Sequence, residues 1–271
     1  MFVQTDKENN WLVMTFDRPQ RGNAFGTMIA DELTAILGTL SEHLEAWSRA
    51  PQSMLIPVRG IVFRAKIQPK GRPIWIAGGD LKELSGLTSL EDGRAYAEKM
   101  GRLCEMIETM PIPVIMAVNG RAIGGGVEFC LAGDIRYATV DSTFEFRQLD
   151  MGLPTGYRGG SRLVELVGRS RAQGLLYQRM RLQPEQAEAH GIIHRTFGSE
   201  SSMNAGIARL RESFDSVDPR VLSTQKKILR LASLELQPSR GRSETDLFAD
   251  VWMNPTQRER LSAFLAQSDR G

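Results

Sequence analysis

The stretch Pro113–Asp134 decides the fold of this chain, and it reads Pro-Val-Ile-Met-Ala-Val-Asn-Gly-Arg-Ala-Ile-Gly-Gly-Gly-Val-Glu-Phe-Cys-Leu-Ala-Gly-Asp. Its first part, Val114–Val118, is an apolar run with β-branched residues between a proline and an Asn-Gly pair, which predicts a buried strand. Three glycines follow at 124–126, and the six residues after them suit a buried helix. We therefore expect a strand, a glycine loop and a helix in succession.

This arrangement can bind an anion, because glycines allow close backbone approach and a helix N-terminus presents unpaired N–H groups with partial positive charge. Glu128 would lie on the first turn of the helix, beside any bound group. No Gly-Lys-Ser/Thr follows the glycines and the spacing is not Gly-x-Gly-x-x-Gly, which argues against a nucleotide P-loop and a dinucleotide site. A tight turn where strand and helix pack closely explains the glycines alone equally well.

A second glycine pair follows another short apolar run. Ile74–Ala77 predicts a strand, and it leads directly into Gly78, Gly79, Asp80 and Leu81. On its own this is a turn that ends a strand. Together, two glycine loops after two strands could place two N–H donors at one point, which is the arrangement of an oxyanion hole.

The composition is that of a soluble globular protein, with 271 residues, 41% hydrophobic and 24% charged. A formal net charge of +2 with scattered basic residues gives no case for nucleic-acid binding. No run approaches the roughly 20 apolar residues of a membrane span, and the N-terminus has no signal-like apolar segment. Cys104 and Cys130 lie in apolar surroundings, and the three histidines lack zinc-site spacing, so we expect a metal-free, cytoplasmic protein.

Strands and helices alternate in the first part of the chain, and helices alone make up the last part. The expected strands include Trp11–Phe16 and Val58–Phe63, and an amphipathic helix is expected over Glu91–Met110. This order predicts an α/β core over residues 1–199 and a helical C-terminal region over residues 200–271.

Several short motifs occur in a specific order and spacing. They are Asp17-Arg18-Pro19 with Asn23-Ala24, Ala77–Lys82, Pro113–Glu128, Asp134-Ile135-Arg136, the loop Gly152–Gly160 and Gly168–Ala172. Taken together, they resemble the crotonase (enoyl-CoA hydratase/isomerase) superfamily over most of the chain. The resemblance implies a spiral of ββα units with a helical C-terminal region for trimerisation, giving a homotrimer or a dimer of trimers. It also implies an acyl-CoA thioester substrate, with no cofactor beyond the coenzyme A of that substrate.

The resemblance also implies roles for particular residues. The N–H groups of Gly79 and Gly125 would stabilise negative charge on the thioester oxygen. Glu128 matches the first of two glutamates that position and split water in hydratases of the family. Further residues expected to line the substrate site are Ala77, Gly78, Asp80, Leu81 and Gly126. For the CoA phosphates the candidates are Arg18, Arg21 and C-terminal basic residues.

The position expected to hold the second glutamate is Gln148, and a neutral amide cannot act as a general base. Asp150 could substitute if residues 146–150 are extended, because it would then share a face with Gln148, although it would lie about 6 to 7 Å farther along the strand. Gln148 could equally be an inert lining residue or hold a water.

The loop after Gln148 carries Tyr157 and Arg158 where the family commonly has small residues. It looks similar to that of decarboxylases acting on methylmalonyl- or ethylmalonyl-type thioesters. Arg158 could hold a substrate carboxylate, or it could be a surface or trimer-contact residue. Tyr157 could donate a proton or form the pocket wall.

Three functions therefore remain open. The first is an enoyl-CoA hydratase or isomerase that uses Glu128 and an oxyanion-stabilised enolate. The second is a decarboxylase of a 2-carboxyacyl-CoA that depends on Tyr157 or Arg158. The third is a non-catalytic CoA-thioester binder or structural trimer.

Overall fold

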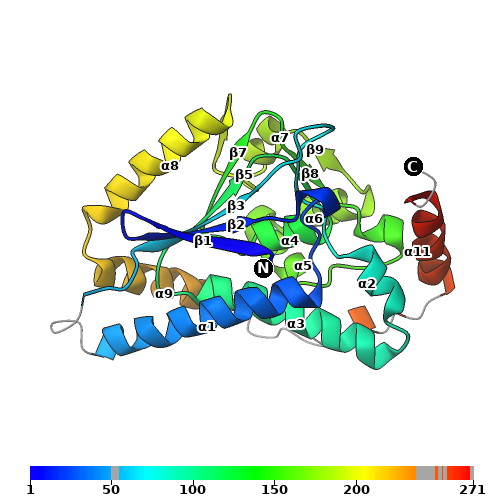
Figure 1. Cartoon of the computed structure of the whole chain (residues 1–271), viewed down its shortest axis with the longest axis horizontal. Coiled ribbons are helices and arrows are strands. Elements are labelled where there is room, and N and C mark those ends of the chain that lie inside the picture. The colour runs from blue at the N-terminus through cyan, green and yellow to red at the C-terminus, as the bar shows by residue number, and fades with distance from the viewer. Residues whose placement is uncertain (50–54, 236–247, 250–251, 253–254, 269–271) are drawn as a thin grey trace.

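Two β-sheets form the framework of the protein, and helices pack around them (Figure 1). The computed structural model describes residues 1–49, 55–235, 248–249, 252 and 255–268. The strands are β1 (Val3–Glu8), β2 (Trp11–Phe16), β3 (Gly60–Ala65), β4 (Ile74–Ile76), β5 (Val114–Val118), β6 (Arg121–Ile123), β7 (Ile135–Thr139), β8 (Thr143–Glu145), β9 (Arg181–Leu182) and β10 (Arg195–Phe197).

Helices connect these strands and make up the last part of the described chain. Two of them, η1 and η2, are 3-10 helices. The helices are η1 (Pro19–Arg21), α1 (Thr27–Arg49), α2 (Leu81–Gly86), α3 (Leu90–Thr109), α4 (Gly125–Cys130), η2 (Gln148–Met151), α5 (Gly159–Val167), α6 (Arg169–Tyr177), α7 (Pro184–Ala189), α8 (Glu200–Asp215), α9 (Pro219–Glu235) and α11 (Pro255–Ser268).

The chain visits the two sheets in turn. The larger sheet has the order β1-β2-β3-β5-β7-β10, and the smaller has the order β4-β6-β8-β9. Thus β3, β5 and β7 each enter the larger sheet, and the strand that follows each of them enters the smaller one. The β1–β2 and β8–β9 pairs are antiparallel, and the other pairs are parallel. This alternation is the expected mixed α/β fold with a parallel sheet.

Burial follows the sequence pattern in the central elements. All five residues of β5 are buried, as its uninterrupted apolar run predicts for a strand covered on both faces. Helix α3 buries Met100, Leu103, Cys104 and Ile107 along one face, and it lies beside α1 under the sheet (Figure 1). A smaller apolar cluster joins the larger sheet to α8 and includes Trp11, Ile115, Phe197, Met203 and Ile207.

Both cysteines are part of the interior. Cys104 is 1% exposed and Cys130 is 0% exposed, and burial raises the pKa of each thiol to about 12. Because the thiolate is the reactive form, we predict that neither cysteine reacts with Ellman's reagent in the folded protein at pH 8, and that both react after unfolding in guanidinium. Fast release of thionitrobenzoate from the native protein would contradict this packing.

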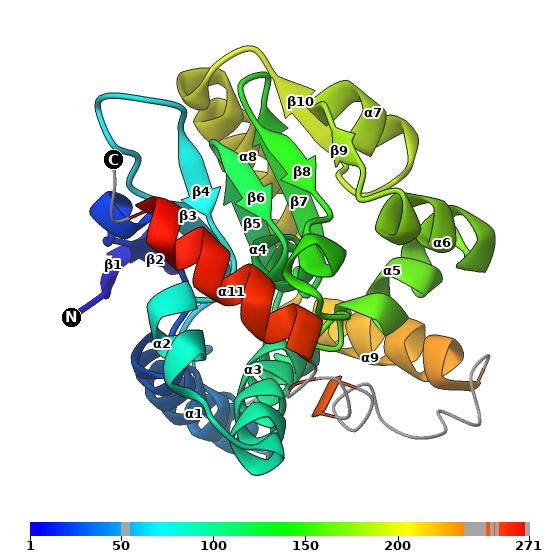
Figure 2. The same cartoon turned by 90° about the vertical axis from the view of Figure 1, so that its right-hand side faces the viewer.

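The C-terminal part of the described chain folds back on its own core. Helix α11 contacts α2 and η2, and it lies in the foreground of Figure 2, next to α2. Arg258 donates to the carbonyl oxygen of Leu87, and Arg260 Nη1 donates to that of Leu149 at 2.6 Å. Helix α11 thus packs on its own chain, and packing of the helical end on neighbouring subunits stays a prediction. Trimerisation stays a prediction.

The division of the chain near residue 200 stays a prediction. Helices α8, α9 and α11 follow β10, while residues 236–247 and 269–271 of the expected C-terminal region lie outside the described residues. Within the described part of the chain, none of the helices combines the length and apolar character needed to span a bilayer.

Candidate active site

Two glycine loops meet at one edge of the smaller sheet. Strands β4 and β6 are parallel neighbours, so the loops that leave their C-terminal ends lie side by side. At Gly78 the contact is tight: a Cβ atom there would lie 2.7 Å from the carbonyl oxygen of Ile123 and 3.2 Å from the amide nitrogen of Gly125. With φ at +91°, Gly78 also has a backbone conformation that favours glycine. The structure thus brings together the two loops that the sequence singled out.

Two amide groups are left unpaired where the loops meet. Within the described residues, neither the N–H of Gly79 nor that of Gly125 donates a hydrogen bond. The neighbouring amides are used: Asp80 N–H donates to the carbonyl oxygen of Phe25 at 2.6 Å, and Phe25 N–H donates to that of Gly78 at 2.7 Å. Gly125 is the first residue of α4, where intrahelical partners for N–H groups are missing. Two donors are therefore available at this point.

The side chain of Tyr157 lies directly against these glycines. A Cβ atom on Gly125 would lie 2.5 Å from the Tyr157 ring, and one on Gly79 would lie 3.4 Å from the Tyr157 hydroxyl. That hydroxyl shares a 2.8 Å hydrogen bond with the hydroxyl of Tyr96, which comes from α3. Burial raises the pKa of both phenols, that of Tyr157 well above its usual value. Both hydroxyls therefore stay protonated at neutral pH.

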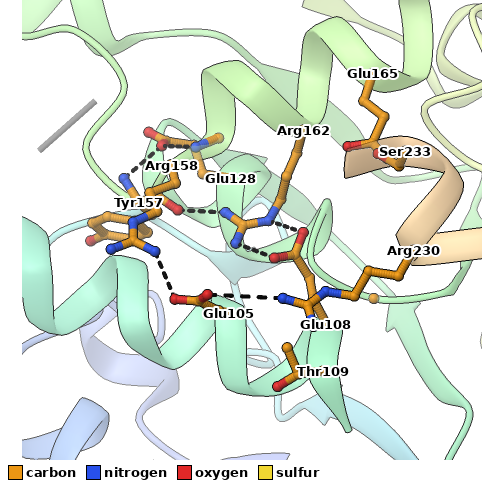
Figure 3. A network of polar contacts seen from close by, with 12 residues as sticks. Glu105, Glu108, Thr109, Glu128, Tyr157, Arg158, Arg162, Glu165, Arg230 and Ser233 are labelled. Carbon is orange, nitrogen blue, oxygen red and sulfur yellow. Dashed lines mark hydrogen bonds and ion pairs between the residues drawn. The ribbon is translucent and has the colours of Figure 1, made fainter. Parts of the chain in front are cut away.

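Glu128 binds the loop that carries Tyr157. Its carboxylate accepts the N–H groups of Tyr157 at 2.8 Å, Gly159 at 3.1 Å and Gly156 at 3.4 Å, as well as the Gln148 side-chain amide at 3.1 Å. The residue is 3% exposed. Figure 3 shows the carboxylate directed at this loop. Glu128 therefore fixes the position of Tyr157, and Gln148 acts as a donor to Glu128.

Arg158 is not brought to the glycine loops. Its guanidinium pairs with Glu105 on α3 at 2.7 Å, and its side chain lies along Gly101 of the same helix. Figure 3 shows the Arg158 guanidinium directed at Glu105. The second carboxylate oxygen of Glu105 lies 3.9 Å from the guanidinium of Arg230. A substrate carboxylate at the glycine loops would therefore not meet Arg158 in this arrangement.

Other expected substrate-site residues have structural contacts. Asp80 caps α2 by accepting the N–H of Lys82 and pairs with Arg18 at 2.7 Å. The N–H of Ala77 donates to the carbonyl oxygen of Gly22. Leu81 is the first residue of α2, and Gly126 packs so closely on the carbonyl of Ile76 that a side chain would clash. Their contacts with substrate stay predictions.

The suggestion that Asp150 replaces the missing glutamate required an extended chain, and this was wrong. Residues 148–151 form the 3-10 helix η2, so Asp150 does not share a face with Gln148 as in a strand. The Asp150 carboxylate instead pairs with Arg147 at 3.1 Å and with Arg179 at 3.4 Å.

Sequence analysis missed two aromatic residues near this site. Tyr96 lies on the buried face of α3, where its spacing alone indicates only packing. Phe248 lies far along the chain, yet its ring packs on the Gly156 backbone, where a Cβ atom would lie 2.8 Å from the ring. Because both contacts are long-range, no local pattern could have identified them.

Comparison with known proteins identifies the family. The family model described as enoyl-CoA hydratase/isomerase matches residues 6–269 of this chain. The chain belongs to this family. As the motifs predicted, it is thus a member of the crotonase superfamily.

Relatives in the family carry different reaction names. The chain is 23% identical over 263 residues to the short-chain-enoyl-CoA hydratase of Clostridium acetobutylicum, covering 97% of this chain and 94% of that one. It is 26% identical over 265 residues to the ethylmalonyl-CoA decarboxylase of Bos taurus, covering 96% and 80%. The family is therefore established by sequence, while the relatives divide between hydratases and decarboxylases.

Solved structures show the same fold. The enoyl-CoA hydratase of Bacillus halodurans superposes with a TM-score of 0.81 at 21% identity, covering 97% of this chain and 100% of that one. A methylmalonyl-CoA decarboxylase in complex with 2-nitronate-propionyl-CoA superposes with a TM-score of 0.80 at 22% identity, covering 98% and 96%. At these identities, the likeness establishes the fold alone.

Proposed function

We propose that this protein is an acyl-CoA thioester enzyme that stabilises an enolate through the N–H groups of Gly79 and Gly125. The observation that carries the proposal is the pair of unpaired amides where the two glycine loops meet. Donors fixed in a buried site need no reorganisation when charge develops on the thioester oxygen, and this gives them their effect on rate. All the groups required come from the chain and the substrate, without a further cofactor.

Hydration or isomerisation of an enoyl-CoA is the first reaction to consider. Both need a group that moves a proton, and Glu128 is the family position for it. In this structure the Glu128 carboxylate already accepts three main-chain N–H groups and the Gln148 amide. It would have to give up part of this network to act on a substrate or a water, and Gln148 cannot assist as a base.

Decarboxylation of a methylmalonyl- or ethylmalonyl-type 2-carboxyacyl-CoA fits the side chains better. Loss of CO₂ leaves an enolate without any base, so it does not require Glu128 to leave the loop. The step then needs a proton donor, and the Tyr157 hydroxyl lies beside the two glycines. Gln148 supports this reading, because it leaves the site with one carboxylate where hydratases of the family have two.

The test is mass spectrometry of the purified protein incubated with crotonyl-CoA, a 3-enoyl-CoA and methylmalonyl-CoA. We expect loss of CO₂ from methylmalonyl-CoA. Gain of one water, or a shift of the double bond, would instead establish the hydratase or isomerase reaction. Binding of all three without any change would contradict an enzymatic role and favour a CoA-thioester binder.

A further inference from the structure

We propose that Tyr157, oriented by Tyr96, is the catalytic acid that protonates the α-carbon of the enolate. This inference rests on the proposed function, because it needs an enolate at the glycine loops. Tyr157 would transfer the proton, and Tyr96 of α3 would orient the Tyr157 hydroxyl.

The position of the Tyr157 side chain is the first argument. Its ring lies 2.5 Å from the position that a Cβ atom on Gly125 would take, and its hydroxyl lies 3.0 Å from that position and 3.4 Å from the corresponding position on Gly79. A thioester oxygen that accepts both N–H groups places its α-carbon one bond beyond the carbonyl carbon, next to this phenol. A proton donor must lie within hydrogen-bond reach of the atom it protonates, and Tyr157 is placed for that.

The hydrogen bond between the two phenols is the second argument. Either hydroxyl can be the donor at 2.8 Å. Within the described residues, the other acceptor near the Tyr96 hydroxyl is the carbonyl oxygen of Phe25, at the long distance of 3.5 Å. If Tyr96 donates to Tyr157, the Tyr157 proton is free to point at the substrate. Tyr96 therefore acts through Tyr157, as a residue that sets the direction of its O–H.

The polar groups nearby are poorer acids. Glu128 is the acceptor in its hydrogen bonds with the N–H groups of residues 156, 157 and 159 and with the Gln148 amide, and that amide does not titrate. Arg158 points to Glu105. Tyr157 holds its proton tightly because burial raises its pKa, yet an enolate carbon is a strong enough base to take it.

Decarboxylation comes first, and protonation of the enolate follows. The bond between the α-carbon and the carboxylate breaks, CO₂ leaves, and the electron pair forms the enolate whose oxygen accepts the Gly79 and Gly125 N–H groups. The enolate oxygen re-forms the carbonyl as the α-carbon bonds to the Tyr157 proton. The resulting phenolate, stabilised by the Tyr96 hydroxyl, takes a proton from water when the product leaves.

The experiment uses the full chain in D₂O and follows deuterium at C2 of the product. Methylmalonyl-CoA gives propionyl-CoA with one deuterium at C2, and its configuration reports the face from which the proton arrives. Wild type is expected to give one configuration. Tyr157→Phe is expected to lower kcat by about 10²–10³, within the range for loss of a general acid, and to give both configurations.

Two further variants separate positioning from packing. Tyr96→Phe should lower kcat about tenfold with KM unchanged and keep a single configuration, because the Tyr157 phenol is still present. Tyr177→Phe is the matched control, because Tyr177 is 67% exposed on α6, and it should behave as wild type. A thermal melt of each variant shows that the fold is intact.

The outcomes distinguish the two proposals. If wild type turns over neither methylmalonyl-CoA nor crotonyl-CoA, the proposed function fails and this inference fails with it. If hydration is the reaction found, deuterium at C2 of the hydrated product gives the same readout. If wild type labels one configuration and Tyr157→Phe does so at the wild-type rate, the proposed function stands and the role of Tyr157 is overturned. A racemic wild-type product also overturns it.

Discussion

Replacement of Gly125 by alanine is expected to lower kcat by about 10²–10³, because the added methyl group displaces the thioester from the two N–H donors although the N–H of residue 125 remains. The new Cβ atom would lie 2.5 Å from the Tyr157 ring and 3.0 Å from its hydroxyl. The ring must therefore move, and with it the surface that receives the thioester. Overpacking of this kind costs about 1–3 kcal/mol of unfolding free energy. Steady-state kinetics and urea unfolding measure the two effects separately.

Two other variants make the result specific. Gly38→Ala is the control, because no heavy atom lies within 4 Å of a Cβ placed on that helical glycine, and it should stabilise α1 by about 0.5–1 kcal/mol without changing kcat. In the double variant of Gly125→Ala with Tyr157→Ala, the losses of stability from the two substitutions should be less than additive because the clash is removed, and activity should stay low. Because alanine keeps the main-chain N–H, wild-type kcat in Gly125→Ala would contradict the placement of the thioester against Gly125 and the Tyr157 ring.

Glu128→Gln is expected to lower stability and activity together. The glutamine amide would place a donor where the carboxylate now accepts main-chain N–H groups of the loop around Tyr157. A buried donor that faces donors costs about 1–3 kcal/mol, and more where a charged group is replaced. The loop should loosen, and kcat should fall because Tyr157 is no longer held against Gly125. Urea unfolding and kinetics on the same preparation test this.

A catalytic role without a structural one would give a different pattern. If Glu128 were only a general base, Glu128→Gln would lose activity and keep wild-type stability, which would contradict the account of Glu128 as the anchor of the loop. Glu42→Gln is the control for an acid-to-amide change on an exposed helix surface, and its effect should stay within about 0.5 kcal/mol.

The sequence was most informative where local pattern and topology agree. The apolar run Val114–Val118 predicted β5, and the glycines after it predicted the start of α4. The meeting of the Gly79 and Gly125 loops followed from a simple rule, because parallel neighbouring strands end at the same edge of a sheet. These features depend on strand pairing and backbone conformation. Glycine and β-branched residues have strong preferences for particular backbone conformations, so the local sequence predicts such features well.

Side-chain direction was much harder to predict. Arg158 was a candidate for binding a substrate carboxylate. It instead forms an ion pair with Glu105 of α3, which lies more than fifty residues earlier in the chain. The phenol pair joins Tyr96 and Tyr157 across 61 positions, and neither motif nor periodicity connects them. The 3-10 helix η2 was also not predicted, since residues 146–150 were considered only as an extended segment. Each of these depends on long-range partners.

The most direct test of the central claim is the carbonyl stretch of a bound acyl-CoA, labelled with ¹³C at the thioester carbon and recorded by isotope-edited infrared spectroscopy. Two N–H donors polarise the carbonyl, so the account predicts a lower frequency on wild-type protein than in water, and a smaller shift on Gly125→Ala. An unshifted frequency on wild type would contradict an oxyanion hole formed by Gly79 and Gly125.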